Sequence, residues 1–318
     1  MAQDLCANLA GHPVFLLSGQ GSQRPGMGAD VMDVPEVAAA FAGMSEVLGF
    51  DLAGFVATAQ PEELNRTRMA QPALCALSVG LSHALEARGV RPGAVLGFSL
   101  GQASALAVAG MLTDAETFAF VRERSLLMEA AAEAHPGCMS ALLKADEESV
   151  RAVCEECARD EVLVAANYNC PGQIVVSGAV GAVERAEAAW AARGGRFSRL
   201  ATSGAFHSPL MADAARGLAA YLEGVEFSEP RIPLVCNVDA RPLAAADARG
   251  RLARHLVSPV RFQQSIEWLI AQGADTFVEV GAGGVLVNLV KRIDKGVARA
   301  LVQDKASFEE LVGKGESA

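Results

Sequence analysis

The stretch Ala94–Ala107, "AVLGFSLGQASALA", joins a short apolar run to an alanine-rich segment that favours a helix. At the junction, Ser99 stands between Gly97 and Gly101. A serine in this setting is typical of a nucleophile elbow, where the glycines let strand and helix pack closely around a strained serine. A tight turn whose serine caps the following helix has the same pattern. The stretch therefore predicts a strand–turn–helix unit and leaves both interpretations of Ser99 open.

Strand-like and helix-like segments alternate on either side of this unit. The apolar runs Val14–Leu17, "IPLVCNV" and "TFVEVG" are typical of buried strands. Helical segments separate them, including a last predicted helix from Val285. Such alternation favours an α/β fold with a mostly parallel sheet and helices on both faces, as in hydrolase-like domains.

Proline, threonine and glutamate give finer boundaries for two helical regions. Helical periodicity runs from about 31 to 89, and we expect breaks around Pro61 and Pro72. Thr113 and Glu116 form a capping box, which predicts a helix over about 114–132.

The pattern changes between residues 134 and 202. The order of strand-like and helix-like segments there is βαββαβ, which is typical of a ferredoxin-like unit. We therefore expect a discontinuous large α/β domain over 1–133 and 203–318, with a ferredoxin-like small domain inserted at 134–202.

Composition limits the partners and the compartment. The 318 residues are 51% hydrophobic and carry a formal net charge of −10, with no dense Lys/Arg tract. This argues against nucleic acid or an anionic membrane as partner; an acidic protein would need a local basic patch such as "VKRIDKGVAR" (290–299). The first residues lack a basic region followed by an apolar core, and no run approaches ~18 apolar residues. We expect a soluble, cytoplasmic protein.

The seven cysteines favour packing over chemistry. Cys154 and Cys157 form a Cys-x-x-Cys pair inside a helical pattern, but no second Cys/His pair accompanies them. We expect buried, reduced thiols and no metal site.

A serine nucleophile needs a base, and the candidates are few. The five histidines are His12, His83, His135, His207 and His255. His207 lies in "SGAFHSPLM", where Ser208 is the expected N-cap and Pro209 the first residue of a helix. A histidine at this place can face a cleft, but the pattern by itself slightly favours a solvated loop histidine.

Arg124 is the third unusual residue. Its helical neighbours at i±3 and i±4 are Phe120, Val121, Leu127 and Met128, so the guanidinium is expected on a buried face. A buried arginine needs a carboxylate, because an unpaired buried charge is costly. The carboxylate can come from the protein itself or from a substrate, and the sequence leaves both open.

Several ordered strings together resemble the malonyl-CoA:acyl carrier protein transacylase family over nearly the whole chain. They are "GQGSQ" (19–23), "QPAL" (71–74), "GFSLGQASALAVAGML", "RSLLME", "NCPGQIVVSG", "GAFHSPLM", "NVDA" and "FVEVGAGGVL". The family's fold is also the one expected above.

The resemblance implies roles for the reacting groups. Ser99 matches the family's nucleophile, and His207 matches its general base and acid. The backbone N–H groups of Gln20 and Leu100 match the oxyanion hole. A main-chain carbonyl near "SPVRF" orients the histidine in the family, and the matching position here is His255, where many relatives have glutamine.

The resemblance also implies how the acyl group is recognised. Arg124 matches the arginine that pairs with the malonyl carboxylate, and Phe206 in "AFH" matches a bulky residue that crowds an α-methyl group. Phe98 replaces the usual histidine beside the acyl pocket, which leaves the strictness of malonyl preference open. The other departures from the family are Gln102 for Glu, Ser18 for Pro, and Ala282 and Gly284 in the family's "GPGK".

The implied activity is transfer of a malonyl group from malonyl-CoA to the thiol of acyl carrier protein through a malonyl-serine. The resemblance implies no metal or resident cofactor, and we expect a monomer. A serine thioesterase and a scaffold subunit without catalysis are the alternatives; Arg124 argues against the first, and Ser99 with His207 against the second. The pathway stays open: fatty-acid synthesis, a polyketide system, or charging of a malonate decarboxylase carrier protein.

Overall fold

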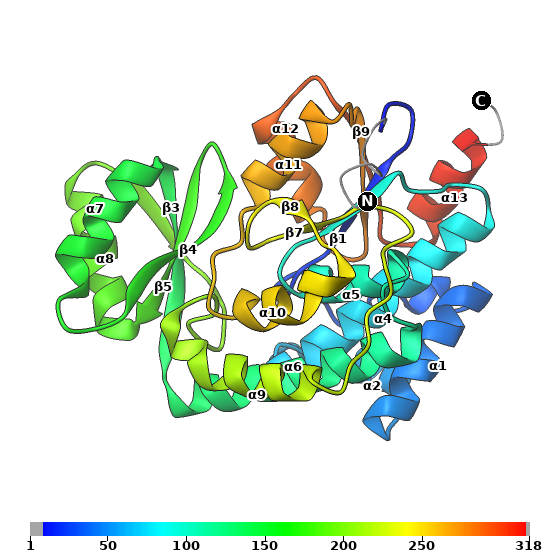
Figure 1. Cartoon of the computed structure of the whole chain (residues 1–318), viewed down its shortest axis with the longest axis horizontal. Coiled ribbons are helices and arrows are strands. Elements are labelled where there is room, and N and C mark those ends of the chain that lie inside the picture. Colours follow the sequence, from blue (N-terminus) through cyan, green and yellow to red (C-terminus); the bar gives the residue numbers. More distant parts are fainter. Residues whose placement is uncertain (1–8, 316–318) are drawn as a thin grey trace.

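The computed structural model describes residues 9–315, and two β-sheets organise them (Figure 1). The larger sheet has the strand order β10-β9-β1-β2-β7-β8. Its strands are β1 (Val14–Leu17), β2 (Ala94–Gly97), β7 (Leu234–Cys236), β8 (Arg241–Pro242), β9 (Thr276–Val280) and β10 (Ala298–Val302). All neighbouring pairs are parallel except β7 with β8. The predicted mostly parallel sheet is confirmed.

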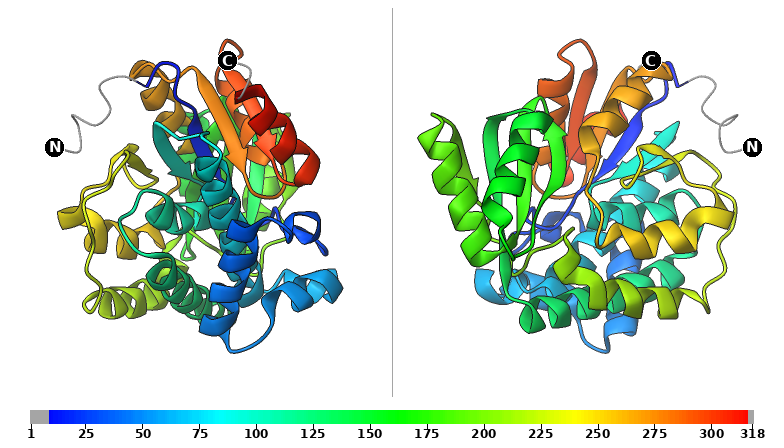
Figure 2. Two further views of the ribbon diagram at one scale, coloured as in Figure 1. Left: turned by 90° about the vertical axis from the view of Figure 1, so that its right-hand side faces the viewer. Right: turned by 60° about the vertical axis from the view of Figure 1, so that its left-hand side comes forward.

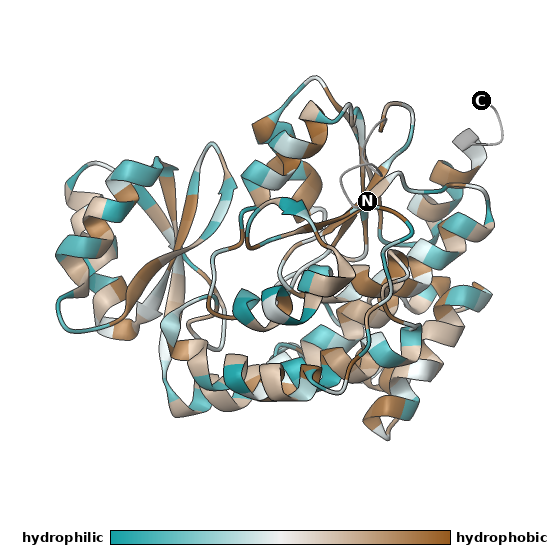
Figure 3. Cartoon of the chain, viewed as in Figure 1, coloured by the Kyte–Doolittle hydropathy of each residue, from teal (hydrophilic) through white to brown (hydrophobic). Residues whose placement is uncertain are grey.

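Helices cover both faces of this sheet. Alternate residues of β1 belong to two different apolar clusters: Phe15 and Leu17 face one, Val14 and Leu16 the other. The first cluster also contains residues of α1 (Pro35–Leu48), α4 (Thr67–Ala87), α5 (Leu100–Val108) and α6 (Asp114–Ala134), and the second contains residues of α11 (Phe262–Ala271) and α12 (Val285–Ile293). Figure 3 shows strongly hydrophobic residues along the strands and more hydrophilic ones on outward helical faces. The sequences of the buried strands are continuous apolar runs because both faces of the sheet are covered and neither is exposed to solvent.

The helices around the larger sheet have the following bounds. They are α1 (Pro35–Leu48), α2 (Leu52–Thr58), α3 (Pro61–Leu64), α4 (Thr67–Ala87), α5 (Leu100–Val108), α6 (Asp114–Ala134), α9 (Ala212–Leu222), α10 (Ala245–His255), α11 (Phe262–Ala271), α12 (Val285–Ile293) and α13 (Lys305–Gly315), with short 3-10 turns η2 (Ala29–Val31) and η3 (Pro209–Met211). The capping box of Thr113 and Glu116 is present at the start of α6, as predicted. The break at Pro61 is also confirmed, since α3 begins there.

The predicted break at Pro72 is wrong. Pro72 lies inside α4, which continues over 21 residues. Proline removes one backbone hydrogen bond, but nearly all of α4 between Ala70 and Leu85 is buried. Packing of this helix outweighs the local cost, because tertiary burial supplies most helical stability in proteins.

Four elements of the two sheets and their helices were absent from the prediction: β8, α10, β10 and α13. Helix α10 has a single large apolar residue, Leu252, among alanines and charged residues, and β10 is half-exposed over most of its length, so neither has a strong apolar pattern. Helix α13 follows β10 at the end of the chain. The helix expected from Val285 is therefore α12 and not the last one.

The smaller sheet is antiparallel and built from consecutive elements. Its strand order is β4-β5-β3-β6, from β3 (Gly137–Ala145), β4 (Leu163–Cys170), β5 (Gly172–Ala179) and β6 (Arg196–Arg199). Helices α7 (Glu147–Ala158) and α8 (Val180–Ala192) pack on it and on each other. Figure 2 shows this sheet and its helices beside the larger sheet.

Backbone hydrogen bonds join strand β4 of the smaller sheet to the segment that leads into α11. Tyr168 N–H donates to the Val260 carbonyl at 2.9 Å, and Val260 N–H donates to the Ala166 carbonyl at 2.8 Å. Strand β4 is thereby fixed against the segment that leads into α11.

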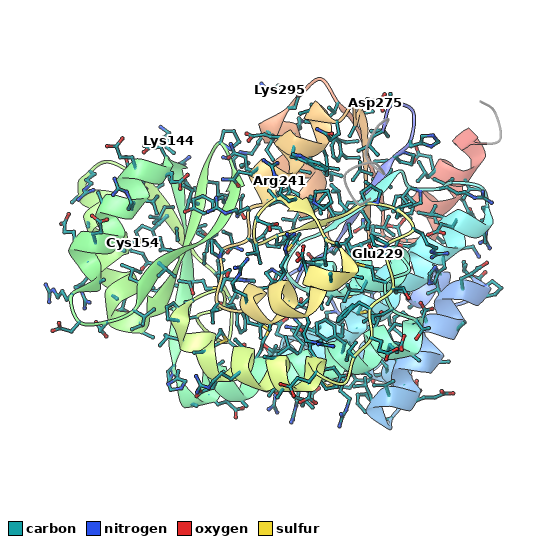
Figure 4. All side chains as sticks on the ribbon, viewed as in Figure 1. Lys144, Cys154, Glu229, Arg241, Asp275 and Lys295 are labelled. Atoms are coloured by element: carbon teal, nitrogen blue, oxygen red, sulfur yellow. The ribbon has the colours of Figure 1, made fainter. Side chains whose placement is uncertain are left out.

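The Cys-x-x-Cys pair lies in the core of the smaller sheet. Cys154 and Cys157 are buried in an apolar cluster with residues of β3, β5 and α8, and Figure 4 places Cys154 on this side of the molecule. Burial raises the pKa of the Cys154 thiol to about 12, which disfavours the reactive thiolate. Within residues 9–315 no group of three or more His, Cys, Asp or Glu side chains is arranged to hold a metal ion. Cys6 and the rest of residues 1–8, on which part of the N-terminal prediction rests, lie outside the described residues.

No single helix in the described part of the chain is long and apolar enough to cross a membrane. Only α1 and α2 taken together meet the length and composition criteria, and they are bent by 101°.

Candidate active site

The turn between β2 and α5 holds Ser99 in a strained backbone conformation. Its φ is 51° and its ψ is −99°, which non-glycine residues rarely adopt. Gly97 and Gly101 allow this turn: a Cβ on Gly97 would overlap the backbone of Gly101, and a Cβ on Gly101 would overlap the Leu17 carbonyl. The predicted strand–turn–helix unit is present, with Ser99 at its tip.

Ser99 and His207 are in hydrogen-bond contact. Ser99 Oγ lies 2.7 Å from His207 Nε2. On the other side of the ring, His207 Nδ1 lies 3.0 Å from both the His255 and the Ser258 carbonyl oxygens. Carbonyls only accept hydrogen bonds, so Nδ1 carries the proton and Nε2 is free to accept from the Ser99 hydroxyl. The neighbours of His207 thus fix its tautomer.

His207 is buried, and its surroundings disfavour the charged ring. Only 3% of the residue is exposed. Burial, together with the positive charge of Arg124, lowers the pKa of His207 to about 4, although the two carbonyls oppose the shift. The imidazole is therefore neutral near pH 7.

The segment that carries His207 is fixed from both sides. His207 has a φ of 58°, so its backbone is also in the left-handed region. The Ser177 hydroxyl of β5 donates to the Phe206 carbonyl at 2.7 Å, and Ser208 caps η3 by accepting from Leu210 N–H. Phe206 itself is buried in the larger core. The predicted N-cap at Ser208 is confirmed.

The remaining described histidines lie elsewhere, apart from His255. His83 contacts Asp114 and His135 contacts Asp213, each at 3.0 Å. His255 is the last residue of α10, and its ring centroid lies 5.0 Å from that of His207. Its carbonyl meets His207, while its own side chain has only a long 3.5 Å contact, from Nδ1 to Gln102.

Arg124 is fully buried and points at the serine. It is 1% exposed. Nη1 donates to Gln71 Oε1 at 2.6 Å, and Nη2 donates to Ser99 Oγ at 3.3 Å. No carboxylate of the described residues forms an ion pair with it, and burial alone lowers the pKa of the guanidinium to about 10. Because the protein supplies only neutral acceptors there, the interpretation with an internal Asp or Glu partner is wrong for the described residues.

The loop after β1, which contains Gln20, lies against the backbone directly before Ser99. A Cβ on Gly19 would lie 2.7 Å from the Phe98 carbonyl, so the two backbones are in contact. Leu100 is the first residue of α5, and N–H groups in the first turn of a helix have no partner within it. The Gln20 side chain is held by Gln71 and Thr67 at 3.1 Å each.

A cavity of about 510 Å³ opens beside the elbow, between the two sheets. Gln20 and Phe98 line it from the larger sheet, and Asn167 and Asn169 line it from β4. Phe98 packs edge-on against Phe262, with ring centroids 5.5 Å apart. A ligand in this cavity would contact the residue directly before Ser99.

Three residues of this site were not assigned a role by name in the sequence prediction, although Ser258 begins the "SPVRF" segment that the resemblance implicated. Gln71 bonds Arg124, the Ser258 carbonyl bonds His207, and Asn237 bonds the backbone of Ser99 at 2.8 Å. Gln71 and Asn237 occur in the strings "QPAL" and "NVDA", but their partners are far away in sequence. Only their presence in those strings could have drawn attention to them.

Comparison with known proteins gives a consistent result. The family model described as "Acyl transferase domain" matches residues 14–315. The malonyl CoA-acyl carrier protein transacylase of Escherichia coli K12 is 40% identical over 302 residues, which cover 93% of this chain and 98% of that protein. The corresponding protein of Bacillus subtilis 168 is 38% identical over 299 residues, covering 93% and 94%.

Solved structures agree with the sequence relatives. The MCAT of Streptococcus pneumoniae superposes with a TM-score of 0.91 at 39% identity, covering 95% of this chain and 99% of that one. A malonyl-transacylase in complex with a type II PKS acyl-carrier protein superposes with a TM-score of 0.92, at 39% identity and the same coverage. With the α/β fold, the strained Ser99 and its contact with His207, these matches show that the chain belongs to the malonyl CoA-acyl carrier protein transacylases of the acyl transferase family.

Proposed function

We propose that this protein transfers a malonyl group from malonyl-CoA to the phosphopantetheine thiol of acyl carrier protein through a malonyl-serine. The observation that carries the proposal is the buried Arg124, which lacks an acidic partner among the described residues and points at Ser99 Oγ. A carboxylate on the acyl group would supply the missing charge at the reacting atom. The names of the relatives give the same acyl group and acceptor.

In the first half of the reaction, Ser99 Oγ attacks the thioester carbonyl of malonyl-CoA. His207 Nε2 takes the hydroxyl proton, and the carbonyls of His255 and Ser258 stabilise the imidazolium through Nδ1–H. The N–H groups of Gln20 and Leu100 are proposed to hold the oxyanion, the latter at the positive end of α5. The C–S bond then breaks, and His207 returns the proton to the CoA thiolate.

In the second half, the carrier thiol enters by the same path. His207 removes its proton, the sulfur attacks the malonyl-serine ester, and Ser99 Oγ leaves with the proton from His207. The balance of both halves needs only the thioester, the thiol, and the Ser99–His207 pair. Phe98 is proposed to line the acyl path beside Gln20, because both line the cavity at the elbow.

The strand order of the smaller sheet supports a proposal for the domain organisation. We propose that residues 134–202 form an inserted ferredoxin-like domain, and that 1–133 with 203–318 form the hydrolase-like large domain. The chain order β3-α7-β4-β5-α8-β6 and the sheet order β4-β5-β3-β6 support this. A monomer in the cytoplasm remains our prediction for the working form.

A thioesterase would use the same serine and histidine but pass the acyl group to water. The transferase and thioesterase activities are distinguished by mixing the enzyme with acetyl-, malonyl- or methylmalonyl-CoA, with and without acyl carrier protein. The measurements are the mass of the carrier protein and the amount of free acid. The proposal expects malonyl on the carrier and little free malonate. Rapid release of malonate with an unmodified carrier would favour the hydrolase.

The pH dependence of acylation follows from the lowered pKa of His207. The base works only when neutral, and a lowered pKa keeps it neutral to lower pH, so kcat/KM should fall in acid near pH 4 and not near 6.5. The measurement is the acylation rate of Ser99 by acetyl-CoA, which has no titrating carboxylate, from pH 4 to 8. Circular dichroism at each pH controls for unfolding; a midpoint near 6.5 in folded protein contradicts the assignment.

Phe206 is proposed to favour malonyl over methylmalonyl groups by crowding the α-methyl. A steric difference of one carbon usually gives about 10–200-fold discrimination in kcat/KM. We expect a preference of that order in the wild type and a smaller one in Phe206→Leu. Equal kcat/KM for the two acyl-CoAs in the wild type would remove Phe206 from this role.

A further inference from the structure

Asn237 stands where three parts of the site meet. It follows β7 and is fully buried. In the register of the parallel pair, Leu96 of β2 is opposite Val235 of β7. Two residues further along both strands, Asn237 falls opposite Phe98, the residue between Gly97 and Ser99.

At Asn237 the backbone of β7 no longer pairs with β2. The side chain of Asn237 makes the hydrogen bonds to β2 and to Ser99 that the backbone would otherwise make. In a parallel ladder, one residue bonds the C=O and the N–H that flank its opposite residue. Here Asn237 Nδ2 donates to the Gly97 carbonyl at 2.7 Å, and Oδ1 accepts from Ser99 N–H at 2.8 Å. The carboxamide thus closes the ladder over the residues that form the strained turn.

The backbone of Asn237 reaches two other elements. Its N–H donates to Gln102 Oε1 in α5 at 2.5 Å, and its carbonyl accepts from Arg261 N–H at 2.9 Å. Arg261 lies three residues after Ser258, whose carbonyl accepts a hydrogen bond from His207 Nδ1. One residue therefore connects the turn under Ser99, the helix behind it, and the segment that orients His207.

From this placement we propose that Asn237 is a positioning residue for Ser99: its carboxamide holds the strained turn at the distance from His207 that proton transfer needs. The inference rests on the proposed function, because it assigns Asn237 no contact with the substrate. A backbone with φ of 51° at Ser99 relaxes unless its surroundings hold it. Ser99 N–H and the Gly97 carbonyl are the two groups of the turn that Asn237 holds.

The test compares two variants at Asn237 with a control in the same strand. Asn237→Leu keeps the branched shape of the side chain and removes both of its hydrogen bonds. Asn237→Asp keeps the acceptor for Ser99 N–H, but as a carboxylate it repels the Gly97 carbonyl. Val235→Ala disturbs β7 through packing alone, since Val235 is a buried apolar residue of this strand.

We expect Asn237→Leu to lower the acylation rate of Ser99 by roughly a hundredfold with KM for malonyl-CoA unchanged, because misplacement by ~1 Å costs about that much. Labelling of Ser99 by a fluorophosphonate should slow equally, because that probe forms an Oγ–P bond, releases fluoride and needs the same proton transfer without malonyl recognition. Val235→Ala, compared at a temperature where both variants are folded, should acylate at close to the wild-type rate.

Asn237→Asp tests the role of the two hydrogen bonds within a single variant, because a change of pH alters its side chain without a further substitution. A buried carboxyl group beside a carbonyl has a raised pKa, and its neutral form can both donate to Gly97 and accept from Ser99. Its rate relative to wild type should therefore recover as pH falls from 8 to 5.5, while His207 is still neutral.

A wild-type acylation rate of Ser99 in Asn237→Leu would overturn the inference. So would a deficit in Asn237→Asp that is independent of pH and matched by Val235→Ala. Failure of the proposed function looks different: wild-type protein would then label with the fluorophosphonate but take no acyl group from malonyl-CoA.

Discussion

Replacing His207 by alanine is expected to lower kcat/KM for malonyl transfer by on the order of a thousandfold or more, by analogy with other serine–histidine pairs. The reason is the 2.7 Å contact between Ser99 Oγ and a neutral His207 Nε2. Without a base, the serine hydroxyl is a weak nucleophile at neutral pH. The measurement is steady-state transfer to acyl carrier protein, with mass spectrometry of Ser99 to separate the two half-reactions.

His255→Gln is the matched control for this prediction. His255 meets His207 through its backbone carbonyl, which glutamine keeps; its side chain lies beside the His207 ring and has one polar contact within residues 9–315, 3.5 Å to Gln102. This variant should stay near the wild-type rate. Equal losses in His207→Ala and His255→Gln would mean that the histidine roles are wrongly assigned.

Arg124→Ala is expected to lower kcat/KM for malonyl-CoA but not for acetyl-CoA. Removing one member of a buried, hydrogen-bonded charge pair costs roughly 2–5 kcal/mol, or about 30- to several thousand-fold in kcat/KM for malonyl-CoA. Acetyl-CoA has no carboxylate, so its transfer should be unchanged or improved, because an unpaired buried cation is gone. The measurement is kcat/KM for both substrates, alongside thermal unfolding.

Arg122→Ala serves as the control on the same helix, because Arg122 is exposed. It should leave both substrates and the melting temperature close to wild type. If Arg124→Ala instead loses activity equally with both substrates and melts at a lower temperature, the arginine is structural. Malonyl preference would then need another source.

Local signals made part of this structure predictable from sequence. The apolar run before Gly97, the glycines around Ser99 and the capping box at Thr113 each act within a few residues, and each is present as predicted. The burial of Arg124 was predictable for the same reason, since its apolar neighbours lie one helical turn away.

Features that depend on distant residues were not predictable in this way. Pro72 stays helical because α4 is buried by its neighbours, and β10 forms because β9 pairs with it although its own pattern is weak. In the site, Gln71 meets Arg124 across 53 positions and Asn237 meets Ser99 across 138. Such contacts are decided by tertiary packing, so local propensity contains no signal for them.

The resemblance placed the histidine-orienting carbonyl at His255, and the geometry adds a second one. His207 Nδ1 lies 3.0 Å from the His255 carbonyl and equally far from that of Ser258. The second acceptor comes from the segment that β4 and Asn237 hold in place. Sequence position alone could not reveal that two carbonyls share one N–H.

The central claim is that Ser99 carries the malonyl group between the two thiols. The most direct measurement is intact and peptide mass after brief exposure to malonyl-CoA, followed by addition of acyl carrier protein. The account predicts one malonyl group on Ser99, its loss to the carrier thiol, and no adduct in Ser99→Ala. A malonyl group on a cysteine with Ser99 unmodified, or an equal adduct in Ser99→Ala, would contradict it.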